Sequence, residues 1–129
     1  MAIRLLVVDD EEDFLESIVM RIELRGIKAH GVTSGTAAID YLEANADNID
    51  VVMLDIKMPG MDGLETLRHI RALYPTLETI VVTGHASQEF SRLGRELGAF
   101  DYLIKPIRLD TILKSVHAAY RARKTTSPE

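Results

Sequence analysis

The stretch IRLLVVDDEEDFLESIVMRIELRG, residues 3–26, joins a short apolar run to an amphipathic segment. The run at 3–8 is rich in Leu and Val and is too short for a helix, which indicates a buried β-strand. After several acidic residues, Phe14, Ile18 and Ile22 recur at the spacing of one helix face. Gly26 follows, a residue suited to the left-handed conformation that often ends a helix. This stretch therefore predicts a strand followed by a helix.

The same alternation repeats along the rest of the chain. Apolar runs at 27–32, 51–54, 79–83 and 102–104 predict four more strands. Segments with helical spacing lie at 34–45, from Asp62 to just before Pro75, at 87–97 and at 109–123. Apolar strands separated by helices are typical of a parallel sheet covered on both faces. We predict an α/β fold, a doubly wound five-stranded parallel sheet with helices on both faces.

The composition fits one domain and excludes several kinds of chemistry. The chain has 129 residues and no Cys, so it has no disulfide framework and no thiol nucleophile. It carries 20 acidic and 15 basic residues, and this net charge of -5 argues against a general affinity for nucleic acid or an anionic membrane. The run Asp9–Asp13 is entirely acidic, so much of the acidity is local. No apolar run is long enough for a signal or membrane segment, and we expect a cytoplasmic protein.

Polar residues stand at the ends of four of the predicted strands. They are Asp9 and Asp10, Asp55, Thr83 and Gly84, and Lys105 and Pro106. The carboxyl ends of parallel strands share one edge of the sheet, where ligands bind in open α/β folds. Three carboxylates in one pocket repel each other, which favours a bound cation, and oxygen ligands of this kind suit Mg²⁺. A metal, a lysine and a hydroxyl around one carboxylate predict a receptacle for a phosphoryl group.

Four segments carry a resemblance to a known family. They are LLVVDDE at 5–11, VVMLDIKMPGMDGLE at 51–65, IVVTGHAS at 80–87 and DYLIKP at 101–106. Together, in this order and each at a strand end, they resemble the response-regulator receiver domain of two-component (phosphorelay) signal transduction, the CheY-like domain. The resemblance covers residues 3–123. It implies a flavodoxin-like fold with strand order 2-1-3-4-5, a receiver domain at 1–124 and a flexible tail at 125–129.

The resemblance also implies a role for each strand-end residue. Asp55 would accept a phosphoryl group from a phosphohistidine of a sensor histidine kinase or phosphotransfer protein. Asp10 would bind Mg²⁺ directly and Asp9 largely through water, and the backbone carbonyl of Lys57 would be a further ligand. Three phosphoryl oxygens would be bound by the Thr83 hydroxyl, the Gly84 amide and Lys105. We therefore expect self-catalysed phosphoryl transfer and autodephosphorylation in a signalling switch, not an independent enzyme.

Further positions would tune or transmit this reaction. The family implies a cis peptide before Pro106. It implies that Tyr102 turns inward with Thr83 and alters the surface of the fourth helix, fifth strand and fifth helix, which would bind an output protein or domain. Lys57 and His85 would set the lifetime of the phosphoryl group through water access. Considered alone, Tyr102 is an ordinary half-buried packing residue.

Other functions remain open from the residues. Asp9 and Asp10 would also suit a simple helix N-terminus. A phosphatase of the haloacid-dehalogenase type would show Asp-x-Asp, whereas Lys57 stands two residues after Asp55. A dinucleotide site would need a G-x-G-x-x-G after the first strand, which the sequence lacks. A phosphorylation-independent adaptor, a homodimer through the fourth and fifth helices, and a stand-alone regulator or a fragment of a longer protein are also left open.

Overall fold

The computed structural model describes residues 2–56, 63–84, 92 and 95–126, and its elements alternate along the chain. They are β1 (Arg4–Val8), α1 (Glu12–Glu23), β2 (Lys28–Val32), α2 (Gly35–Asn45), the short 3-10 helix η1 (Ala46–Asn48), β3 (Val51–Asp55), α3 (Gly63–Leu73), β4 (Glu78–Thr83), β5 (Asp101–Ile104) and α5 (Leu109–Thr126). Most of the helix predicted at 87–97 lies outside the described residues. Among the described helices, none is long and apolar enough to cross a membrane.

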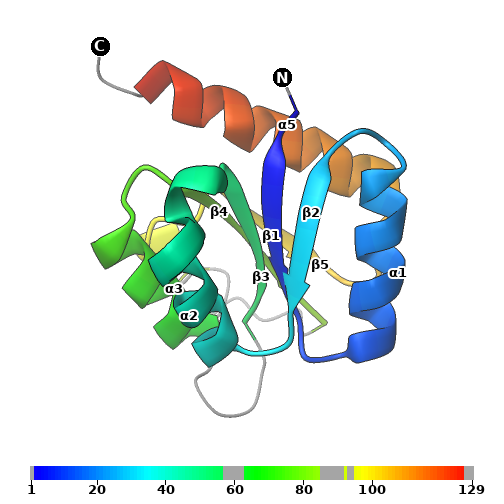
Figure 1. Cartoon of the computed structure of the whole chain (residues 1–129), viewed down its shortest axis with the longest axis horizontal. Coiled ribbons are helices and arrows are strands. Elements are labelled where there is room, and N and C mark those ends of the chain that lie inside the picture. Colours follow the sequence, from blue (N-terminus) through cyan, green and yellow to red (C-terminus); the bar gives the residue numbers. More distant parts are fainter. Residues whose placement is uncertain (1, 57–62, 85–91, 93–94, 127–129) are drawn as a thin grey trace.

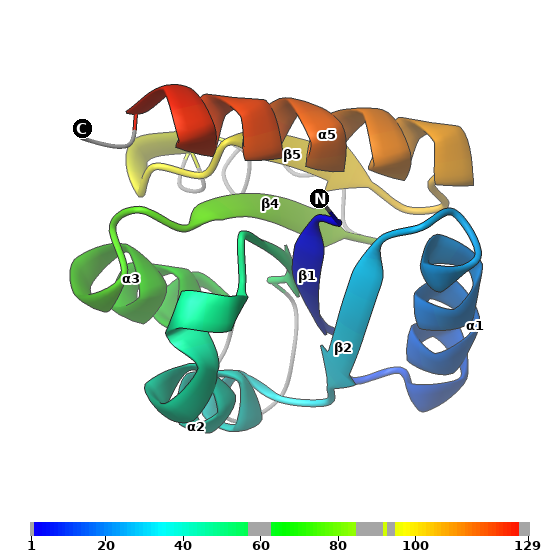
Figure 2. The same cartoon turned by 45° about the horizontal axis from the view of Figure 1, so that its top comes forward.

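The strands form one parallel sheet in the order β2-β1-β3-β4-β5. Helices α1 and α5 cover one face, and α2 and α3 cover the other (Figures 1 and 2). The predicted doubly wound fold and its strand order are therefore confirmed.

The core consists of two apolar layers, one on each side of the sheet. Successive residues of a strand point to opposite faces. Leu5 and Val7 of β1 accordingly pack in the layer under α1 and α5, whereas Leu6 and Val8 pack under α2 and α3. All four are at most 1% exposed, so β1 is buried on both faces, as its unbroken apolar run predicts. This strand holds the acidic pair at its end in a fixed position.

The helix ends follow the sequence signals in part. Gly26 has φ +88°, the left-handed conformation that was expected of it. Ser34 caps α2, because its Oγ accepts a hydrogen bond from the Ala37 amide at 3.0 Å. The buried residues of α1 are Leu15, Ile18 and Ile22, whereas Phe14 is only half-buried. The 3-10 turn η1 was not predicted, and α5 continues three residues beyond the predicted end at Arg123.

Candidate functional site

The strand register brings the predicted site residues to one edge of the sheet. Val8 of β1 pairs with Leu54 of β3, so Asp9, the residue after β1, lies next to Asp55, the last residue of β3. Thr83, the last residue of β4, pairs with Ile104 of β5. The amide of Lys105 donates to the carbonyl of Thr83 at 2.7 Å, which extends this pairing by one step. The strand order therefore brings residues that are far apart in sequence to the same edge of the sheet.

Three carboxylates meet at this edge. One oxygen from each of Asp9, Asp10 and Asp55 lies within 4.8 Å of the others. Asp9 and Asp55 are buried, at 2% and 5% exposure, whereas Asp10 is exposed. The amide of Glu11 donates to Asp9 Oδ1 at 2.9 Å and fixes that side chain. Clustered oxygen ligands with one side open to water are a suitable donor set for Mg²⁺, which retains several waters.

Lys105 supplies the positive charge of the site. Its Nζ lies 2.6 Å from Asp9 Oδ2, 3.0 Å from Glu11 Oε1 and 3.7 Å from Asp55 Oδ2. The ammonium also lies over the ring of Phe14, 4.3 Å from its centroid. The lysine side chain is 14% exposed, so these contacts replace most of its hydration.

The carboxylates decide the protonation of this lysine. Burial alone would lower the pKa of Lys105, because desolvation disfavours the charged form. The hydrogen bonds to Asp9 and Glu11, with the charge of Asp55, outweigh that effect and raise the pKa above its ordinary value. Lys105 is therefore a fixed cation at neutral pH and is not a candidate general base.

Thr83 and Gly84 lie beside the acidic cluster with different surroundings. Thr83 is fully buried at the end of β4, and Gly84 after it is exposed. A Cβ added at Gly84 would meet no atom of the described residues within 4 Å. Sterically, this position therefore does not require glycine among the described residues.

Gly63 at the start of α3 packs directly against the backbone of Asp55 and Ile56, at the end of β3. A Cβ at this residue would overlap the Cα of Ile56 and lie 2.5 Å from the carbonyl oxygen of Asp55. The Gly63 amide donates to the Ile56 carbonyl at 3.2 Å. Only glycine permits α3 to approach the backbone of Asp55 and Ile56 this closely, so Gly63 fixes the backbone that carries Asp55.

Tyr102 lies in β5, and Lys105 and Pro106 follow directly after this strand. Tyr102 is half-buried, and its hydroxyl oxygen is buried without a hydrogen-bond partner among the described residues. Burial raises the pKa of this phenol above its usual range. The peptide bond between Lys105 and Pro106 is cis, the isomer that the resemblance implies.

Some predicted residues cannot be placed, and some contributors were missed. Lys57 and His85 lie outside the described residues. The sequence reasoning treated Phe14 as core and assigned no role to Glu11 or Gly63, although Glu11 stands directly after the aspartate pair. Glu11 can be recognised as a site residue only from the structure, which shows that Lys105 contacts it.

A second group of charges lies at the opposite end of the sheet. Asp50 is 3% exposed and accepts hydrogen bonds from Arg4 Nη2 and Arg123 Nη1, each at 2.9 Å. Burial would raise the pKa of Asp50, but the bonds from Arg4 outweigh it and hold that pKa below its usual value. This network joins β1, the residue directly before β3 and the last turns of α5.

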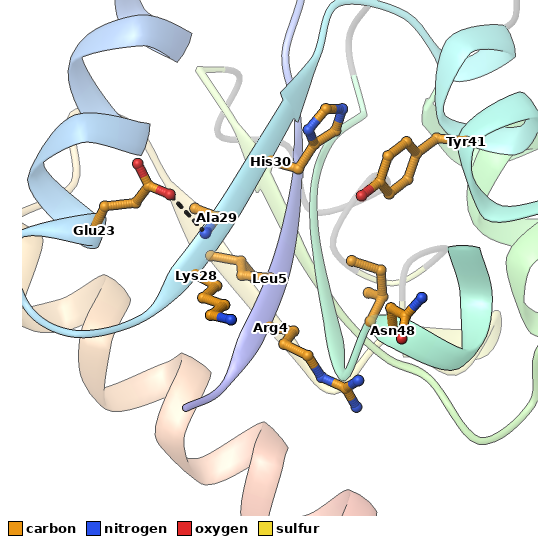
Figure 3. Close-up of a pocket in the computed structure, with 9 residues that line it drawn as sticks. Arg4, Leu5, Glu23, Lys28, Ala29, His30, Tyr41 and Asn48 are labelled. Atoms are coloured by element: carbon orange, nitrogen blue, oxygen red, sulfur yellow. Dashed lines mark hydrogen bonds between the residues drawn. The ribbon is translucent and has the colours of Figure 1, made fainter. Parts of the chain in front are cut away.

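A pocket of about 590 Å³ also lies at that end, between β2 and α2 (Figure 3). Its wall includes Arg4, Lys28 and the stacked rings of His30 and Tyr41, whose centroids are 4.1 Å apart. None of the predicted site residues lines it. Ligands of parallel α/β sheets bind at the carboxyl ends of strands, so the acidic edge remains the candidate site.

Comparisons with known proteins agree with this geometry. The family model described as "Response regulator receiver domain" matches residues 5–117. A receiver domain protein from Clostridium thermocellum is 31% identical, with a TM-score of 0.92 over 97% of this chain and 99% of its own. A CheY-like receiver domain protein from Methanospirillum hungatei is 27% identical, with a TM-score of 0.88 over 98% of this chain and 100% of its own.

Curated relatives are longer than this chain. The C4-dicarboxylate transport transcriptional regulatory protein DctD of Rhizobium meliloti is 36% identical over 91% of this chain and 25% of its own length. The response regulator MprA of Mycobacterium bovis is 34% identical over 96% of this chain and 53% of its own. The chain therefore spans about a quarter to a half of these relatives. On the match to the family model and on the fold, the chain belongs to the response-regulator receiver domains of two-component signal transduction.

Proposed function

We propose that the chain is a phosphorylation-controlled switch in which Asp55 accepts a phosphoryl group from a phosphohistidine of a partner kinase or phosphotransfer protein. The observation that carries this proposal is the placement of Asp55. Its carboxylate is buried, shares one cluster with Asp9 and Asp10, and lies 3.7 Å from the Lys105 ammonium. A carboxylate is a competent nucleophile for phosphorus when neighbouring cations neutralise the phosphoryl oxygens.

The transfer replaces one bond to phosphorus by another. An Asp55 carboxylate oxygen forms the new O–P bond as the P–N bond to the histidine breaks. The electron pair of the broken bond goes to the imidazole nitrogen, which takes up a proton from the solvent. Lys105 would move toward the incoming phosphoryl oxygens, and the Thr83 hydroxyl and Gly84 amide would donate to the others.

A divalent cation completes the charge balance. Asp9, Asp10 and Asp55, with the backbone carbonyl of Lys57, would hold Mg²⁺. The bound metal supplies positive charge to the phosphoryl oxygens as the transfer proceeds. A metal site is supported by the three carboxylate oxygens, one from each aspartate, which lie within 4.8 Å of one another.

The readout would be a changed surface around β5 and α5. A doubly charged group on Asp55 favours the arrangement that brings Thr83 and Lys105 closer to it. Tyr102 stands two residues before the end of β5, and its buried hydroxyl lacks a partner among the described residues, so a rotated position would let this hydroxyl gain a hydrogen bond. An output protein or domain would bind the altered surface.

Intact-mass analysis after incubation with acetyl phosphate tests the central step. The wild-type protein should gain one phosphoryl group with Mg²⁺ and none after chelation. Asp55→Asn should gain none under either condition. An equal gain in wild type and Asp55→Asn, or no gain in the wild type with Mg²⁺, would refute the proposal. The second result would favour a phosphorylation-independent adaptor.

A further inference from the structure

The Lys105 ammonium lies closer to the start of α1 than to Asp55. It donates to Asp9 at 2.6 Å and to Glu11 at 3.0 Å, while the nearest Asp55 oxygen is 3.7 Å away, beyond hydrogen-bond distance. The Phe14 ring on the same helix faces the ammonium as well. Lys105 therefore has a defined resting position, formed by the segment between β1 and α1 and by the first turn of α1.

Glu11 is placed for this contact by the backbone and not by helix capping. It is the N-cap residue of α1, yet its side chain makes no capping hydrogen bond. Its amide instead donates to Asp9 Oδ1, and its carboxylate reaches Lys105. Glutamate is not among the side chains that favour an N-cap, so local helix stability does not account for its side chain here.

We propose that Glu11 is a positioning residue that competes with the phosphoryl group on Asp55 for Lys105. This inference rests on the proposed function and adds a regulatory element to it. The ammonium already bonds Asp9 and Glu11, whereas its 3.7 Å separation from Asp55 Oδ2 is too long for a hydrogen bond, so a phosphoryl oxygen on Asp55 would be a new anionic acceptor beside these two. In this proposal the new acceptor draws the ammonium away from Glu11, so the Glu11 contact favours the unmodified protein.

The size of the effect follows from the exposure of the pair. The Glu11 side chain is 66% exposed and that of Lys105 is 14% exposed. Water screens such a pair on the Glu11 side, so we expect its free energy to be that of an exposed salt bridge. Loss of the pair should therefore strengthen binding of a phosphoryl analogue by about one and a half- to fivefold.

The test uses beryllofluoride, an analogue of the phosphoryl group on a carboxylate, at saturating Mg²⁺, with affinity measured by calorimetry. Glu11→Gln should bind it more tightly by that factor. Glu12→Gln is the matched control, because Glu12 is exposed in the first turn of the same helix and carries the same charge. It should stay close to the wild type.

A second measurement separates positioning from a general change of charge. The ¹⁵N resonance of the Lys105 ammonium, assigned with Lys105→Arg, should shift in unloaded Glu11→Gln and not in Glu12→Gln. Equal affinity changes in both variants, a weaker affinity in Glu11→Gln, or an unshifted Lys105 signal would overturn the inference. A wild-type protein that binds no beryllofluoride would refute the proposed function itself, whereas normal wild-type binding with an inert Glu11→Gln would refute only the competition.

Discussion

Gly63→Ala should destabilise the protein and disturb the phosphoacceptor together. The new Cβ would overlap the Ile56 Cα and lie 2.5 Å from the Asp55 carbonyl oxygen and 2.7 Å from the Ile56 carbonyl carbon. All three neighbours are backbone atoms, so no side chain can rotate to make room and α3 must move. Overpacking of this kind costs about 1–3 kcal/mol. Loss of the Gly63 to Ile56 hydrogen bond adds about 1 kcal/mol.

Alanine offsets part of this cost, because it is a better helix former than glycine by at most about 1 kcal/mol. We therefore expect the free energy of unfolding to fall by about 2 kcal/mol, measured by urea denaturation followed by circular dichroism. Gly84→Ala is the control, since its Cβ would meet no atom within 4 Å in the part of the chain that the structure describes, and it should stay within about 0.5 kcal/mol of the wild type. If Gly63→Ala were as stable as Gly84→Ala, the inferred close contact between Gly63 and the backbone of Asp55 and Ile56 would be refuted.

Three further predictions concern single side chains. Ser34→Ala should lower the free energy of unfolding by about 1 kcal/mol in urea denaturation, because it removes the cap of α2. Tyr102→Phe should leave that free energy unchanged or raise it by up to about 1 kcal/mol, because the buried hydroxyl it removes has no partner among the described residues; a clear loss would contradict this. Asp50→Asn should cost about 2 kcal/mol at pH 7, since it weakens bonds to Arg4 and Arg123. The folded-state pKa of Asp50 lies below its unfolded value, so its contribution is present above about pH 4 and is lost as the pH falls further; urea titrations should show the difference between wild type and variant shrinking there.

The sequence allowed the sheet and its acidic edge to be predicted because both depend on local patterns. Unbroken apolar runs such as 51–54 are decisive for a strand buried on both faces. The direction of a parallel sheet then determines which end of every strand shares an edge. The joint position of Asp9, Asp55, Thr83 and Lys105 follows from that rule, and the register agrees with it.

The partners of individual side chains could not be predicted in the same way. Lys105 and Glu11 are 94 positions apart in the chain, and Arg123 and Asp50 are 73 apart. No local pattern indicates which of several nearby carboxylates a flexible lysine will contact. Gly63 escaped notice for a related reason, since a glycine at a helix start is common and only the proximity of Ile56 makes it necessary.

The acidic edge also has an electrostatic order built into it. Among the described residues, Lys105 is the cation that contacts Asp9, Glu11 and Asp55, and Asp10 adds a fourth carboxylate to this edge, so the acidic groups outnumber the described cation. A phosphoryl donor is itself an anion and is repelled by such a site, whereas a divalent cation is attracted. Lys105 bonds Asp9 and Glu11 and interacts with Asp55 only through the longer 3.7 Å ion pair. Under the proposed function, the metal should enter before the donor, and Lys105 should leave its resting position only when new negative charge on Asp55 outweighs the attraction of Asp9 and Glu11.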